Sequence, residues 1–123
     1  MVGRPSIIDA VLLLLVLAGW QAQAWAHAFL DHGEPGVGAE LKAPPAKIVL
    51  YFDSELELPF SGLRVEDASG QPVCQGDVQS DPANPTWLSQ PCPPLPPGTY
   101  RVIWSVIARD THHTEGDYTF TIQ

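Results

Sequence analysis

Three residues have the types and spacing of a metal site: His27, Asp110 and His112. His27 directly follows Ala24-Trp25-Ala26, a small-x-small sequence of the kind that signal peptidase cleaves, so cleavage there would make His27 the new N-terminus. An N-terminal histidine offers its α-amine and its ring to one metal ion, and a metal can displace the amine proton near neutral pH. Cleavage after Ala24 is the alternative, and it would leave two residues in front of His27.

Asp110 and His112 are two positions apart in a polar stretch between two predicted strands. In an extended backbone such side chains point to the same face, so a carboxylate and an imidazole would converge. With His27 they would supply an amine nitrogen, two imidazole nitrogens and a carboxylate oxygen. Cu(II) prefers a tetragonal set of this kind, and the Irving–Williams order also favours it, so we predict one Cu(II) ion. A solvated polar loop is the plainer interpretation of the same stretch.

Other chemistry has no comparable signal. The sequence contains no nucleophile elbow, no glycine-rich phosphate loop and no Ser and His spacing typical of a catalytic triad, so we predict that the protein is not an enzyme. Residues 27–123 carry five Lys and Arg against 13 Asp and Glu, a net charge of −8. Such a balance opposes binding to nucleic acid and to anionic membranes, and it suits cations.

The first 26 residues are typical of a secretory signal peptide. A short segment with one cation, Arg4, precedes the apolar run Ala10–Ala18, which is too short for the roughly 20 residues that span a bilayer. We therefore predict a signal peptide at 1–26, a mature domain at 27–123 without a membrane span, and a periplasmic location. An uncleaved membrane anchor is the alternative.

The periplasm is an oxidising compartment, so Cys74 and Cys92 are expected to form a disulfide, and a thiol metal site is the alternative.

The residues that must position this site are predicted to be strands. Alternating apolar residues and short turn signals favour an all-β chain, a small Ig-like antiparallel sandwich. The expected strands are 47–53, 63–67, 86–89, 99–107 and 117–122, with weaker candidates at 27–31 and 73–78. The strand at 99–107 has apolar residues on both faces, which predicts a central position. Leu95–Tyr100 resembles a tyrosine corner, in which the Tyr hydroxyl bonds back to the backbone.

Taken together, these segments resemble the CopC family of periplasmic copper-binding proteins over essentially all of residues 27–123. The matching motifs are the histidine at the mature N-terminus, a Leu-x-x-Gly-x-Tyr-x-Val-x-Trp segment at 95–104, and an Asp-x-His…Gly-x-x-x-Phe ending at 110–120. The combination of the N-terminal histidine with Asp-x-His is specific, whereas the strand segments alone are not.

The resemblance implies a Greek-key β-sandwich and a role in copper resistance or homeostasis, in which copper is sequestered or delivered. It implies Cu(II) ligation by the α-amine and ring of His27 with Asp110 and His112, and it makes Glu55 a candidate group near the metal. Some members add a Met-rich Cu(I) site, but this chain has no Met after Met1, so we do not expect that site. A membrane copper permease or another copper protein is the expected partner, and a monomer is the expected state.

Two rival functions follow from the same residues. A histidine-brace copper oxygenase also uses an N-terminal histidine, although Asp110 would occupy a position that oxygen or substrate needs. A metal-free Ig-like assembly module would not need His27 or His112 at all. His32 and His113 are not included in the predicted site, because His32 falls on a predicted turn and His113 would point away from His112 in an extended chain.

Overall fold

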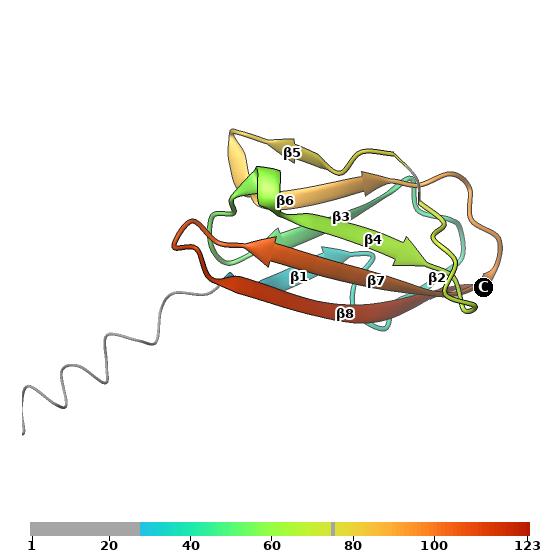
Figure 1. Ribbon diagram of the computed structural model, residues 1–123. Coiled ribbons are helices and arrows are strands. Elements are labelled where there is room, and N and C mark those ends of the chain that lie inside the picture. Colours follow the sequence, from blue (N-terminus) through green and yellow to red (C-terminus); the bar gives the residue numbers. More distant parts are fainter. Residues whose placement is uncertain (1–27, 75) are drawn as a thin grey trace, which may run out of the picture.

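The computed structural model describes residues 28–74 and 76–123. Within them, eight strands form two four-stranded sheets that face each other (Figure 1). The elements are β1 (Leu30–Glu34), β2 (Glu40–Leu41), β3 (Lys47–Phe52), the 3-10 helix η1 (Leu58–Phe60), β4 (Gly62–Glu66), β5 (Gln79–Asp81), β6 (Asn84–Pro91), β7 (Gly98–Ile107) and β8 (His113–Ile122). The predicted all-β sandwich is confirmed.

The chain crosses repeatedly between the two sheets, as in Greek-key sandwiches. One sheet has the order β1-β3-β6-β5 and the other β2-β8-β7-β4. All strand pairs are antiparallel except β2 with β8, so the second sheet is mixed, where a fully antiparallel one was expected. The exception arises at the crossing that follows β1, where the chain passes to the edge of β8 and bonds to it at Gly38 and Ala39.

The core comes from the alternation that the sequence shows. Inward-facing side chains of β3, β7 and β8 are at most 6% exposed: Ile48, Leu50, Phe52, Tyr100, Val102, Val106, Tyr118, Phe120 and Ile122. β7 lies between β4 and β8, which confirms its predicted central position. Trp104 is only partly buried, and its indole lies against Gly116, where any side chain would collide with the ring.

Two predicted features stabilise one end of the sandwich. The Tyr100 hydroxyl donates to the carbonyl oxygen of Pro96 at 2.5 Å, which confirms the tyrosine corner. Cys74 and Cys92 form a disulfide that joins the segment after β4 to the end of β6. In the chain-entropy view, such a bridge stabilises a domain of this size by about 3 kcal/mol.

Burial changes the acidity of a second tyrosine that ties the two sheets together. Tyr118 on β8 donates from its hydroxyl to the carbonyl oxygen of Pro35, just after β1, at 2.8 Å. The side chain is 6% exposed, and this burial raises the pKa of Tyr118 to about 12. The phenol therefore stays neutral and keeps donating across the neutral and mildly alkaline range.

Some predicted element boundaries are wrong. The segment 73–78 is not a strand over its described residues, because Gly76 adopts a positive φ of 121° and the Cys74 disulfide fixes the chain before it; β5 begins only at Gln79. β1 begins at Leu30 and runs on to Glu34, three residues beyond the end that was expected. β8 begins at His113 rather than at 117, since it pairs with the full length of β7.

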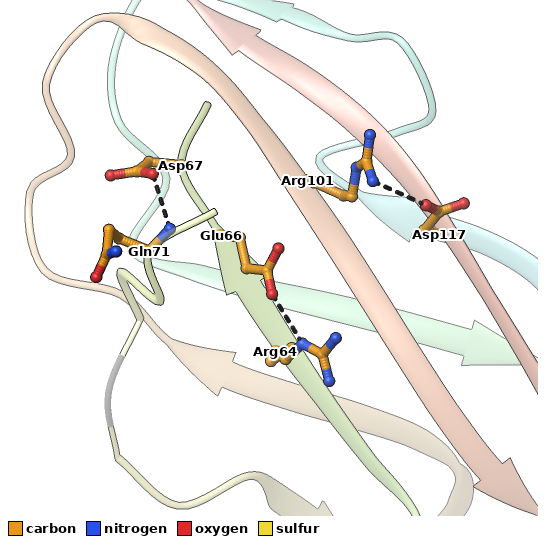
Figure 2. Close-up of polar contacts among 6 residues, drawn as sticks. All are labelled: Arg64, Glu66, Asp67, Gln71, Arg101 and Asp117. Carbon is orange, nitrogen blue, oxygen red and sulfur yellow. Dashed lines mark hydrogen bonds and ion pairs between the residues drawn. The ribbon is translucent and has the colours of Figure 1, made fainter. Parts of the chain in front are cut away.

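Two charged pairs lie on the outer face of the β2-β8-β7-β4 sheet (Figure 2). Arg64 Nε lies 3.1 Å from Glu66 Oε1 on β4, and Arg101 Nη1 lies 3.7 Å from Asp117 Oδ2 between β7 and β8. Ion pairs this exposed contribute little to stability.

Among the described residues, no helix is long and apolar enough to cross a membrane.

Candidate metal centre

Asp110 and His112 lie in a tight turn between β7 and β8. The turn is closed by two backbone hydrogen bonds, from Ala108 N–H to the His112 carbonyl oxygen at 3.0 Å and from Thr111 N–H to the Ala108 carbonyl oxygen at 2.9 Å. Thr111 has a φ of 75°, a left-handed conformation that is uncommon for a residue other than glycine. The backbone of this segment is therefore not extended, which was the condition under which we expected the two side chains to converge.

The turn nevertheless brings the carboxylate and the imidazole together. Asp110 Oδ2 lies 3.2 Å from His112 Nδ1, and Asp110 Oδ1 accepts the backbone N–H of His112 at 3.1 Å. The second contact is an Asx-turn, in which a short acidic side chain bonds to the backbone two residues on. The side chains are 35% and 52% exposed respectively, so an ion from solvent can reach both.

The start of the described chain lies beside this turn. Ala28 is 1% exposed, and its carbonyl oxygen accepts a hydrogen bond from Thr114 Oγ1 at 2.6 Å, two positions after His112. Phe29 is joined to Asp53 by two hydrogen bonds: its N–H donates to Asp53 Oδ1 at 2.8 Å, and its carbonyl oxygen accepts the N–H of Asp53 at 2.9 Å. The first described residues are thus fixed to β8 and to the end of β3.

The segment after β3 also contacts the turn. Glu55 Oε2 lies 2.6 Å from Arg109 Nη1, and the backbone N–H of Arg109 donates to the Glu55 carbonyl oxygen at 3.1 Å. An isolated β-bridge between Leu56 and Ala108 continues this contact. Glu55, which the family resemblance made a candidate near the metal, therefore binds the residue that precedes Asp110.

The other two histidines lie elsewhere. His32 is on β1, where its ring stacks on Tyr51 with centroids 4.3 Å apart and its Nδ1 lies 2.7 Å from Asp31 Oδ2. His113 begins β8, and its Nε2 lies 2.7 Å from Ser105 Oγ on the outer face of the sheet.

The complete predicted ligand set extends beyond what the structure describes, because His27 lies outside the described residues. Within residues 28–74 and 76–123, no three His, Cys, Asp or Glu side chains come close enough together to hold a metal. The structure therefore brings together Asp110 and His112 and places Ala28, the neighbour of His27, beside them.

Two residues near the site were missed in the sequence. Thr114 and Asp53 fix the first described residues, through contacts that span 86 and 24 positions along the chain. Long-range hydrogen bonds of this kind leave no local pattern. The only available signals were the position of Thr114 two residues after His112 and that of Asp53 at the end of a predicted strand.

Comparison with known proteins identifies the family of this chain. The family model described as the CopC domain matches residues 30–123. Copper resistance protein C of Escherichia coli is 33% identical over 126 residues, covering 96% of this chain and 99% of the relative. The crystal structure of CopC from Methylosinus trichosporium OB3b superposes with a TM-score of 0.75 at 30% identity, covering 79% of this chain and 94% of that structure.

PcoC, a methionine-rich copper resistance protein from Escherichia coli, has a TM-score of 0.71 at 36% identity over 80% of this chain and all of that structure. The present chain contains a single Met, so it shares the fold without the methionine-rich composition. The resemblance drawn from the sequence motifs is confirmed, and a copper-related function is supported. The chain belongs to the CopC family.

Proposed function

We propose that the protein is an exported, non-catalytic carrier that holds one Cu(II) ion through the α-amine and ring of His27 together with Asp110 and His112. In this proposal residues 1–26 are removed during export to the periplasm. The mature domain, residues 27–123, then sequesters copper or delivers it to a membrane copper permease or another copper protein.

The observation that carries the proposal is the hydrogen bond between Ala28 and Thr114. This bond holds Ala28, to which His27 is joined, beside Thr114, and Thr114 is two positions after His112, which supports an ion shared by the two histidines. An amine, two rings and a carboxylate held by a rigid sandwich need little rearrangement to bind.

The donor set favours the 2+ state of copper. A carboxylate and nitrogen donors suit Cu(II), whereas Cu(I) selects soft thioether or thiolate sulfur. Residues 27–123 contain no Met, and both cysteines are joined in the disulfide. A site that binds one oxidation state well is suited to carrying copper and poorly suited to redox catalysis. The Asp110 carboxylate beside His112 also opposes an oxygenase, which needs an open position on the metal.

The test is to express the full precursor, purify the exported protein and record its intact mass with and without one equivalent of Cu(II). We expect the mass of residues 27–123 and a gain of one copper ion. A His27→Ala precursor is the matched control and should gain none under the same conditions. A mature chain that begins at Trp25, or one that begins at His27 and takes up no copper, would contradict the proposal and favour the metal-free assembly module.

A further inference from the structure

The two parts of the proposed site come from opposite ends of the sequence, and one short segment touches both. The segment Asp53–Leu56, which follows β3, bonds to Phe29 at the chain start and to Arg109 in the ligand turn. Figure 1 shows the start of the described chain, the end of β3 and the turn between β7 and β8 at the same end of the sandwich, on the left.

The contacts of Asp53 constrain the chain start in two ways. Its carboxylate and its backbone N–H bond to the N–H and the carbonyl oxygen of the same residue, Phe29, at 2.8 and 2.9 Å. A pair of bonds to one residue fixes that residue's orientation as well as its position. The direction in which the chain leaves Phe29 toward the N-terminus is set by this pair and by the Thr114 bond to Ala28.

The contacts of Glu55 constrain the turn in the same manner. One bond runs from the Arg109 backbone to the Glu55 carbonyl oxygen, and one ion pair joins the two side chains at 2.6 Å. These side chains are 50% and 59% exposed, so the pair contributes little to the stability of the domain. The pair instead restrains the position of Arg109, which directly precedes Asp110 in the chain.

We propose that Asp53 and Glu55 are positioning residues that hold the two parts of the copper site in register; this inference rests on the proposed function. Asp53 orients the N-terminal part that carries His27, and Glu55 orients the turn that carries Asp110 and His112. Neither needs to touch copper. Groups that orient metal ligands typically change metal affinity by 10–100-fold when they are removed.

The experiment compares Cu(II) affinity, by competition titration, and the Cu(II) EPR spectrum across variants purified from the exported full precursor. Asp53→Ala should weaken binding about 10-fold and shift the spectrum, because the N-terminal part loses its orientation. Asp53→Asn should restore binding to within about threefold, because an amide oxygen still accepts the Phe29 N–H. Rescue by the amide distinguishes positioning from ligation or from a simple charge effect.

Glu55→Ala should weaken binding by about threefold and change the spectrum, less than Asp53→Ala, because the exposed ion pair is weak and the backbone bond to Arg109 remains. Adding Arg109→Ala should cost nothing further if Glu55 acts through Arg109. Two controls should leave affinity and spectrum unchanged. Glu57→Ala removes the same charge two positions on, and Glu66→Ala breaks the Arg64 ion pair on the outer face of β4 (Figure 2).

The outcomes separate the inference from the proposed function. If the wild type binds copper, His112→Ala abolishes binding, and Asp53→Ala and Glu55→Ala both behave as the wild type, the positioning role is wrong and the copper site stands. If the wild type takes up no copper, the proposed function fails and the positioning role fails with it. If Asp53→Ala does not fold, Glu55→Ala, which removes an exposed ion pair, still decides the question.

Discussion

Two Asp–His pairs occur among residues 28–74 and 76–123, and only one is proposed to bind copper. Asp110 and His112 are 3.2 Å apart in the turn between β7 and β8, and Asp31 and His32 are 2.7 Å apart on β1. The two histidines are almost equally exposed, at 52% and 53%. Side-chain chemistry and accessibility therefore do not separate the two pairs.

The surroundings of the pairs do separate them. The His112 pair lies beside Ala28 and Phe29, which Thr114 and Asp53 hold in place, so a donor joined to Ala28 can approach it. The His32 pair lies on the outer face of a sheet, where the ring stacks on Tyr51. A carboxylate beside an imidazole is thus a common element, and its function depends on which other donors the fold brings to it.

Acid should have the largest effect on copper binding. Nitrogen donors must be deprotonated to bind a metal, so protons compete with copper for all three nitrogen donors of the proposed site. We expect Cu(II) affinity to fall by roughly 1,000-fold or more between pH 7 and 5, measured by competition titration. The pH profile of His32→Ala should be the same; an affinity that is flat over this range would contradict nitrogen ligation.

Exchanging the two histidines for alanine tests the comparison directly. His112→Ala should weaken Cu(II) binding by more than about 100-fold, because losing a ligand costs more than losing a group that orients one. His32→Ala should change it less than twofold. Calorimetric titration of the two variants side by side measures the difference, and equal losses would show that our choice between the pairs is wrong.

Removing the bond that holds Ala28 should lower the copper affinity of the site that contains the His112 pair. Thr114→Val keeps a β-branched side chain in β8 but removes the hydroxyl that binds the Ala28 carbonyl oxygen. We expect about a 10-fold loss of copper affinity and a loss of about 1 kcal/mol in the free energy of unfolding. Thr119→Val, on the exposed face of the same strand, is the control. Unchanged affinity in Thr114→Val would mean that the anchor does not serve the site.

Breaking the disulfide should affect stability and leave both pairs as they are. Cys92, bonded to Cys74, directly follows β6, and the end of β6 lies at the opposite end of the sandwich from the turn between β7 and β8 (Figure 1). The double variant Cys74→Ala/Cys92→Ala should lose about 3 kcal/mol, which for a domain of this size corresponds to a melting temperature lower by roughly 15 °C. Copper affinity at 25 °C should change less than twofold. A large loss of affinity in a variant that is still folded would show that the two ends are coupled.

The fold was largely predictable because its strands carry strong local signals. The alternation of apolar and polar residues in β3, β7 and β8 indicated which side chains face inward, and the tyrosine-corner sequence indicated where β7 begins. The parallel pairing of β2 with β8 could not be predicted, since a strand of two residues has no periodicity. The strand predicted at 73–78 was wrong for a similar reason. A short segment carries little local signal, and here a disulfide and a glycine with positive φ determine the backbone instead.

The candidate site was only partly predictable. We expected Asp110 and His112 to converge if the backbone was extended; they do lie close together, but the chain turns through a left-handed Thr111. A threonine does not indicate a left-handed conformation, whereas a glycine or an asparagine at this position would have indicated one. The contacts of Asp53 and Thr114 were not predicted, because a hydrogen-bonding side chain carries no mark of a distant partner.

The bond from Thr114 to Ala28 also bears on when such a site could exist during biogenesis. It joins residues 86 positions apart, the second of them in the last strand of the domain. A chain that has not yet been exported to its end, or one that is truncated before β8, lacks this partner and the ligand turn. If the proposed site is correct, only complete and folded molecules would bind copper, and partly translocated chains would not.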